Sequence, residues 1–134
     1  MTFHVVTSFG PGGWDLYARR MVSTFLEHWK DGILTVYYHD CERPTDLPPD
    51  PRLRWYSLHD VVGFDAFREK APRGGEPYNF RFDAWKFSAK VFALWDTSRR
   101  SLKMKDPGRL VWLDADTFTT KPVDTAWLKA LCPD

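Results

Sequence analysis

Short runs of apolar residues, rich in β-branched and aromatic side chains, recur along the chain and predict β-strands. They occupy residues 3–9, 33–38, 53–57 and 109–113. The second and fourth runs are almost continuously apolar, a pattern typical of parallel sheets that are covered on both faces. We therefore expect a buried sheet built from four short strands.

Other segments show the period of an amphipathic helix. Over residues 14–29 and again over residues 80–97, apolar side chains recur at helical spacing and so share one face. In the second of these helices that side consists of Ala84, Phe87, Val91, Leu94 and Trp95. Shorter helices are predicted near residues 60–70 and 124–131, and segments rich in glycine, proline or polar residues separate the elements.

The elements follow one another as strand, helix, strand, strand, helix, strand. This order predicts an α/β fold with a Rossmann-like, mostly parallel sheet and helices on both faces. No repeat or low-complexity tract divides the sequence, so we expect a single domain over residues 1–134. Ligands of such sheets bind beyond the carboxyl ends of the strands.

Composition and charge limit the kinds of partner. Lys and Arg number 19 and Asp and Glu 18, which gives a net charge of +1, and no basic run resembles a nucleic-acid footprint. The N-terminus lacks the pattern of a signal peptide, and no apolar stretch approaches the about 20 residues that span a bilayer. Cys41 and Cys132 form neither a metal-binding pattern nor a disulfide framework. We expect a cytoplasmic protein without a nucleic-acid partner.

Polar or glycine-rich residues follow each predicted strand. These groups are Thr7-Ser8-Phe9 with the glycines of residues 10–13, His39-Asp40, the segment after Ser57, and Asp114-Ala115-Asp116. The glycines match neither a dinucleotide-binding nor a P-loop signature, so a tight turn is the simpler interpretation and a phosphate cradle the alternative. His39 and His59 are candidates for metal binding or acid–base chemistry, although a lone histidine more often has a structural role.

The two aspartates after the fourth strand carry the clearest chemistry. In an extended segment, residues two apart point to the same side, so Asp114 and Asp116 project together with their Cα atoms about 7 Å apart. Like charges this close favour a nearby cation. Because Mg²⁺ and Mn²⁺ prefer carboxylate and phosphate oxygens, the pattern predicts a site for a metal–diphosphate complex. The alternative is that both side chains only cap the following turn.

The segment around these aspartates resembles a known motif. Residues 108–122, Gly-Arg-Leu-Val-Trp-Leu-Asp-Ala-Asp-Thr-Phe-Thr-Thr-Lys-Pro, resemble the D-x-D region of GT-A fold glycosyltransferases, in which an apolar strand leads into D-A-D and a short segment ends in proline. Residues 80–90 are similar to the Arg- and Lys-bearing helix that precedes this motif in retaining, glycogenin-like enzymes. The likeness covers the layout of nearly the whole chain, and the D-x-D segment is its specific part.

The resemblance implies a nucleotide-sugar-binding domain that uses Mn²⁺ or Mg²⁺. Asp116 would bind the metal, and Asp114 would bind the metal or the ribose of the donor. The other implied contacts are Thr7, Ser8 and Phe9 to the nucleoside, Asp40 to the base or ribose, and Arg81, Lys86 or Lys90 to the diphosphate or sugar. For the basic group, the alternative is local pairing between Asp83 and Lys86 on the helix.

Enzymes of this kind transfer a sugar, most often from a UDP-linked donor, to an acceptor that the sequence does not identify. They continue well past the D-x-D, whereas eighteen residues follow Asp116 in this sequence. We therefore expect an incomplete GT-A domain, the donor-binding half of a glycosyltransferase. A longer gene product or a partner chain would supply the acceptor half, and no catalytic base or nucleophile is predicted.

Three other functions stay open. A haloacid-dehalogenase-type phosphatase also places D-x-D after an apolar strand and would use Asp114 as its nucleophile. Its motif favours Thr or Val where this chain has Phe118, and it normally opens the domain. A nucleotidyltransferase needs a basic glycine-rich first loop, which residues 10–14 lack. A non-catalytic α/β binding or assembly module predicts the same fold without metal-dependent nucleotide binding.

Overall fold

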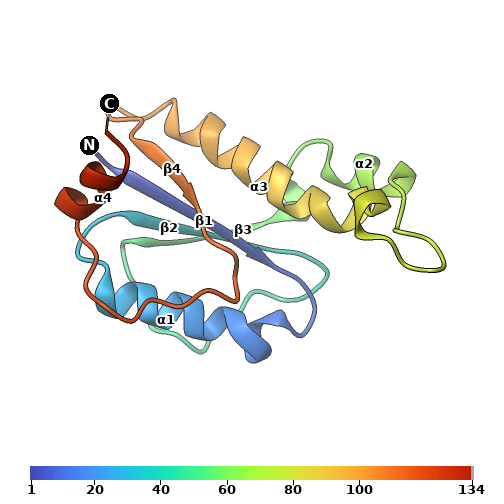
Figure 1. The fold of residues 1–134 in the computed structure, drawn as a ribbon, viewed down its shortest axis with the longest axis horizontal. Coiled ribbons are helices and arrows are strands. Elements are labelled where there is room, and N and C mark those ends of the chain that lie inside the picture. Colours follow the sequence, from blue (N-terminus) through green and yellow to red (C-terminus); the bar gives the residue numbers. More distant parts are fainter. Residues whose placement is uncertain (134) are drawn as a thin grey trace.

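The computed structural model describes residues 1–133, so Asp134, the last residue of the expected domain, lies outside the described part. Four parallel strands form one sheet in the order β3-β2-β1-β4 (Figure 1). The strands are β1 (Phe3–Phe9), β2 (Ile33–Tyr38), β3 (Leu53–Ser57) and β4 (Arg109–Trp112). The predicted α/β fold with a parallel sheet is confirmed, and each strand lies within one residue of its predicted range.

Within the described residues, four α-helices accompany the sheet. They are α1 (Arg19–His28), α2 (Phe64–Lys70), α3 (Ala84–Ser101) and α4 (Thr125–Leu131). The predicted helix over residues 14–29 is present, but its first part, Trp14–Ala18, is a π-helical turn. Within residues 1–133, every helix is too short or too polar to cross a membrane.

The predicted helix over residues 80–97 is divided in two. Phe80–Phe82 forms a short 3₁₀ turn, and α3 begins only after Asp83. The Asp83 carboxylate accepts a hydrogen bond from the Lys86 backbone N–H at 2.9 Å, which caps the first turn of α3. Beyond the predicted end, α3 continues to Ser101. A capping aspartate thus sets the start of the helix, where the hydrophobic pattern alone predicted no break.

Helices α1 and α3 cover opposite faces of the sheet (Figure 1). Alternate side chains of β1 point to the two faces. Val5 and Phe9 pack in the core beneath α1. Val6 packs with Ala89 and Ala93 of α3 in the second core. Because both of its faces are buried, β1 is a central strand of the sheet and lies between the two cores.

The face of α3 that turns towards the sheet is not the predicted one. Phe87, Val91 and Trp95 were expected on the buried side, but they are 46%, 62% and 44% exposed. The buried side carries small and polar residues instead, namely Ser88, Ala89, Ala93, Asp96, Thr97 and Ser101. Small side chains allow α3 to approach β1 closely, and Asp96 and Thr97 find hydrogen-bond partners in the core. A prediction based on hydrophobic spacing therefore selected the wrong face.

Asp96 is the centre of a buried polar network between β2 and α3. It is 1% exposed and accepts hydrogen bonds from the Tyr37 hydroxyl and from Arg100 Nε, both at 2.7 Å. Burial by itself would raise the pKa of Asp96, but the hydrogen bonds from Arg100, Tyr37 and Arg99 outweigh it and hold the pKa below its ordinary value. Burial raises the pKa of Tyr37, which therefore remains a donor. The network fixes α3 to β2.

Strand β4 lies at one edge of the sheet and pairs with β1 alone among the described strands. Its residues are only partly covered, and Leu110 is 39% exposed. Beside it, under the segment that leads into α4, an apolar cavity of about 570 Å³ is lined by Val111, Leu113 and Trp127 among others. The sheet is therefore well covered at β1 and β2 and open at β4.

Replacing Asp96 with alanine is expected to destabilise the protein by about 3 kcal/mol, because the buried Tyr37 hydroxyl loses its acceptor and α3 loses its anchor. Urea unfolding followed by circular dichroism at neutral pH measures this change. Glu27→Ala, which removes an exposed carboxylate of α1, is the matched control and should change stability little.

The contribution of Asp96 to the free energy of unfolding should depend on pH. Its native pKa is lowered, so its carboxylate stabilises the fold above the unfolded pKa of about 4, and this contribution is lost as the pH falls through the native pKa. The stability difference between wild type and Asp96→Ala should therefore shrink in acid. A variant as stable as wild type at neutral pH would contradict the anchoring role.

Candidate functional site

The carboxyl ends of β1 and β4 meet where the order of the sheet reverses. From β1 the chain builds β2 and β3 on one side, and β4 pairs with the other side of β1. In open α/β sheets, loops diverge at such a switch point and leave a crevice for a ligand. Val6 pairs with Trp112, and the Leu113 N–H still bonds to the Val6 carbonyl at 3.1 Å. When this pairing is extended by two residues along both strands, Asp114 lies opposite Ser8.

Trp112 connects two residues that were predicted separately. Its indole Nε1–H donates a hydrogen bond to Asp114 Oδ1 at 2.6 Å, and Lys90 Nζ lies 5.0 Å from the centre of its ring. Lys90 comes from α3, so this contact lies on the face of the sheet that α3 covers. Lys86 precedes Lys90 by one helical turn on the same side of α3 and is exposed. The structure therefore brings Lys90 of α3 to the end of β4.

The D-x-D segment turns as soon as β4 ends. The Thr117 N–H bonds to the Asp114 carbonyl at 2.9 Å, so residues 114–117 form a turn in place of the extended segment expected through Asp116. Ala115 is buried, whereas Asp114 and Asp116 are both exposed. Among residues 1–133, no side chain donates a hydrogen bond to Asp116, and its carboxylate is open to a ligand.

Two exposed carboxylates suit a metal ion that keeps several water ligands, and they do not suit a metal ion that is enclosed by protein ligands. Within residues 1–133, no group of three or more His, Cys, Asp or Glu side chains could hold a metal. Mg²⁺ bound by one or two carboxylates takes its other ligands from water and substrate phosphates. The oxygens of Asp114 and Asp116 therefore fit a metal that binds together with a diphosphate, and they do not form a complete metal site by themselves.

Of the three residues predicted to contact a nucleoside, Ser8 alone has a partly exposed side chain. Thr7 and Phe9 are 0% and 3% exposed. Odd-numbered residues of β1 point towards α1, where these two side chains are packed, so any contact of Thr7 or Phe9 with a nucleoside stays a prediction. Ser8 points to the opposite face, the one on which Trp112 and Lys90 lie.

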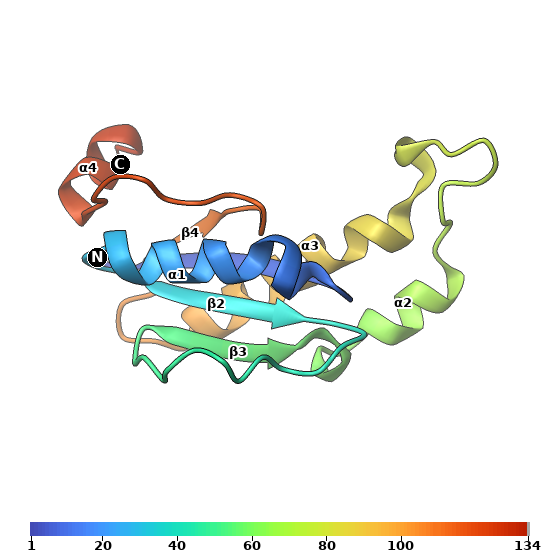
Figure 2. The ribbon, with the colours of Figure 1, turned by 90° about the horizontal axis from the view of Figure 1, so that it is seen from below.

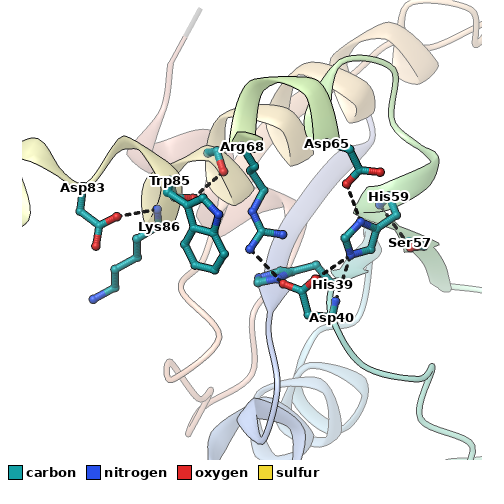
Figure 3. A network of polar contacts seen from close by, with 10 residues as sticks. His39, Asp40, Ser57, His59, Asp65, Arg68, Asp83, Trp85 and Lys86 are labelled. Atoms are coloured by element: carbon teal, nitrogen blue, oxygen red, sulfur yellow. Dashed lines mark hydrogen bonds and ion pairs between the residues drawn. The ribbon is translucent and has the colours of Figure 1, made fainter. Parts of the chain in front are cut away.

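The basic residues before and within α3 are solvent-exposed. Arg81 lies in the 3₁₀ turn that precedes α3, with its guanidinium 5.8 Å from the ring of Phe80. The alternative of an Asp83–Lys86 ion pair is not what the structure has, because the Asp83 carboxylate bonds to the Lys86 backbone N–H and to the Tyr78 hydroxyl. Figure 3 shows the Asp83 carboxylate directed to the start of α3, where it bonds to the Lys86 backbone.

A second polar cluster lies at the ends of β2 and β3 and centres on Asp40 (Figure 3). Asp40 Oδ2 accepts a hydrogen bond from Arg68 Nη2 at 2.9 Å and lies 3.0 Å from His39 Nδ1. Asp40 Oδ1 lies 3.0 Å from His59 Nε2, and His59 Nδ1 lies 2.6 Å from Asp65 Oδ1. Asp40 Oδ2 is engaged by Arg68 and His39, and Oδ1 lies against the ring of His59. A base or ribose would have to displace one of these partners to reach this carboxylate.

The backbone of Asp40 is held in an unusual conformation. Its φ of 55° lies in the left-handed region that favours glycine. The contacts with Arg68 and with His59, which accepts a hydrogen bond from the Asp40 N–H at 3.1 Å, offset the strain. Burial alone would raise the pKa of Asp40, but hydrogen bonds from His39 and Arg68 and the positive charge of Arg68 lower it to about 2. Asp40 is therefore ionised at neutral pH.

Arg68 joins α2 to this cluster. Its side chain is 8% exposed, and its guanidinium lies 4.8 Å from the ring of Phe64 and 3.8 Å from the ring of Trp85. Arg73 also lies 3.8 Å from the Trp85 ring. Arg68, Asp65 and Trp85 were not predicted as site residues. Arg68 and Asp65 lie on the short helix α2 and Trp85 lies in the first turn of α3, and only the fold brings them beside Asp40.

The glycine-rich turn and His39 support one another. The Gly13 N–H bonds to the Gly10 carbonyl at 3.0 Å, which closes a tight turn. A Cβ atom at Gly10 would lie 2.7 Å from His39 Cε1, so the ring needs glycine at this position. Burial lowers the pKa of His39 although the neighbouring Asp40 acts in the opposite direction. The tight-turn interpretation of the glycines is confirmed, and the rings of His39 and His59 contact carboxylates.

Comparison of the chain with protein-family models, with curated proteins and with solved structures gives no match. The fold and the geometry of the two clusters therefore carry the functional conclusion.

Replacing Arg68 with methionine is expected to raise the pKa of Asp40 from about 2 towards its ordinary value, because the variant removes a hydrogen bond and a positive charge. Carboxyl ¹³C chemical shifts followed through an acid titration measure this pKa. The carboxylate stabilises the native state above the unfolded pKa, and the contribution is lost as the pH falls through about 2 in wild type.

Arg73→Met is the matched control, because Arg73 stacks on the same Trp85 ring. It should leave the pKa of Asp40 near about 2. An Asp40 titration that is identical in wild type and Arg68→Met would show that Arg68 does not hold this carboxylate.

Proposed function

We propose that this chain binds a nucleoside-diphosphate sugar together with Mg²⁺ or Mn²⁺, as the donor-binding part of a GT-A type glycosyltransferase. The position of Asp114 and Asp116 at the switch point of a parallel sheet, beside Lys90 of α3, is the observation that carries the proposal. Carboxylates suited to a cation and an ammonium group suited to phosphates lie at the edge where such sheets hold their ligands. The resemblance of residues 108–122 to the D-x-D region supports the same conclusion.

Each side chain at the end of β4 has a separate task in this proposal. Asp116 binds the metal ion, and Trp112 orients Asp114 through its 2.6 Å hydrogen bond, which leaves Asp114 Oδ2 for the metal or the ribose. Lys86 and Lys90 neutralise the diphosphate from the side of α3. When bound, the metal ion would stabilise negative charge on the departing nucleoside diphosphate.

The nucleoside is proposed to lie towards the ends of β1 and β2. Ser8 is the partly exposed side chain there, on the same face as Trp112. Asp40 contributes by holding the neighbouring loop through its contacts with Arg68 and His59. A UDP-sugar is the proposed donor because UDP is the usual carrier in the enzymes that the D-x-D segment resembles, and Arg81 is a further candidate for the sugar or the diphosphate.

The acceptor half is proposed to come from a further segment or from a partner chain that packs against β4. This strand is a partly uncovered edge, and unpaired edges readily accept another strand. Trp127 and Leu131 of α4, which are 54% and 59% exposed, add apolar surface to the region. The identity of the acceptor and the stereochemical course of transfer depend on that other half.

Mn²⁺ is expected to increase the affinity for UDP, and Asp116→Asn is expected to lower the Mn²⁺-dependent affinity by about tenfold or more, because the metal loses its charged ligand. Titration calorimetry of UDP with and without Mn²⁺ measures both effects. Trp112→Phe keeps an aromatic ring beneath Lys90 but removes the hydrogen bond to Asp114, so it should weaken binding less than Asp116→Asn.

Glu27→Gln is the matched control, since it neutralises an exposed carboxylate on α1 and should leave UDP binding unchanged. Mn²⁺-independent binding, or full binding by Asp116→Asn, would overturn the proposal. A phosphoenzyme at Asp114 would assign the chain to the phosphatases. A folded protein that binds no nucleoside diphosphate would be the assembly module.

A further inference from the structure

The segment between α2 and α3 carries aromatic side chains away from the body of the protein. Figure 2 shows this loop extending beyond both helices. Tyr78, Phe80 and Phe82 are 55%, 58% and 65% exposed. With Arg73 they border one open hollow of about 850 Å³. Large apolar side chains gathered at one exposed position mark an interaction surface.

The loop has a defined shape that keeps these rings exposed. The Asn79 N–H bonds to the Gly74 carbonyl at 2.9 Å, and the Tyr78 hydroxyl donates to Asp83 at 3.0 Å. Gly74 has a φ of 86°, and a Cβ atom there would lie 2.6 Å from the Tyr78 ring. Glycine is therefore required at this turn. The first hydrogen bond closes the loop on itself, and the second ties it to the residue that caps α3.

Positive charge surrounds the aromatic side chains. Residues 70–86 contain four basic and two acidic residues. The basic residues are Lys70, Arg73, Arg81 and Lys86, and all are exposed. Of the two acidic residues, Asp83 is buried and engaged in capping α3, which leaves Glu76 as the exposed carboxylate of the segment. The loop thus combines apolar rings with a local excess of positive charge.

We propose that this loop binds the surface of an anionic membrane, with Phe80 and Phe82 inserted at the boundary between headgroups and acyl chains. Aromatic side chains favour that boundary, and basic residues beside them are attracted to anionic lipids. Phe80 and Phe82 are fully apolar side chains, and the basic residues beside them in the sequence match the charge of anionic lipid headgroups. Attachment is peripheral and does not depend on the proposed glycosyltransferase function.

Sedimentation of the whole chain with vesicles tests the proposal. Wild type should bind vesicles in which about a quarter of the lipid is phosphatidylglycerol, and it should bind pure phosphatidylcholine less well. Phe80→Ser combined with Phe82→Ser should weaken binding about tenfold, because two half-exposed rings no longer insert. Arg81→Gln should weaken binding to the anionic vesicles only, and added salt should do the same.

The matched control is Trp127→Ser combined with Leu131→Ser, which removes two comparably exposed apolar side chains from α4. It should bind as wild type does, and circular dichroism checks that every variant is folded. Equal losses in the two double variants, or no vesicle binding by wild type, would overturn the proposal. The proposal would also be overturned if the protein did not bind vesicles but bound a soluble oligosaccharide through Phe80 and Phe82.

Discussion

Strand β1 is buried on both faces, and the neighbouring strands and helices are positioned by their packing against it. It pairs with β2 on one side and with β4 on the other, while α1 and α3 pack against its two faces. Because all strands are parallel, their carboxyl ends reach the same edge of the sheet. Ser8, Asp40 and Asp114 are far apart in the sequence, yet all three come to that edge.

The two polar clusters at this edge differ in how their charges are satisfied. Asp40 is paired with Arg68 and also hydrogen-bonded to His39, and these contacts lower its pKa to about 2 although burial acts in the opposite direction. Asp116 has no such partner among residues 1–133, and Asp114 is held by a single indole N–H. We infer that the Asp40 cluster shapes the loops, whereas the end of β4 presents unsatisfied charge to a ligand.

The sequence predicted the strands, their parallel direction and the position of Asp114 and Asp116, because these follow from local hydrophobic runs and from the rule for strand ends. It did not predict which face of α3 is buried. That face is selected by the buried partners of Asp96 and by the small side chain of Ala93, which are tertiary effects. Thr7 was predicted as a contact residue because it lies at a strand end, although the alternation along β1 turns it into the core.

The cluster around Arg68 could not be predicted for a related reason. Arg68 and Asp65 lie on the short helix α2 without a recognisable motif, and the packing of α2 brings them to Asp40 and His59. Trp112 was predicted as part of a strand, and its role became visible only when the structure placed Lys90 above its ring. Residues whose role depends on a distant partner leave no signal in a single sequence.

Paramagnetic broadening by Mn²⁺ tests most directly whether the end of β4 binds a metal with a nucleoside diphosphate. Amide spectra of the ¹⁵N-labelled chain would be recorded with trace Mn²⁺, with and without UDP. Broadening is expected to centre on residues 114–117, to extend to Ser8 and the first turns of α3, and to grow when UDP is added. Broadening centred on Asp40 and Asp65, or a pattern that UDP leaves unchanged, would contradict it.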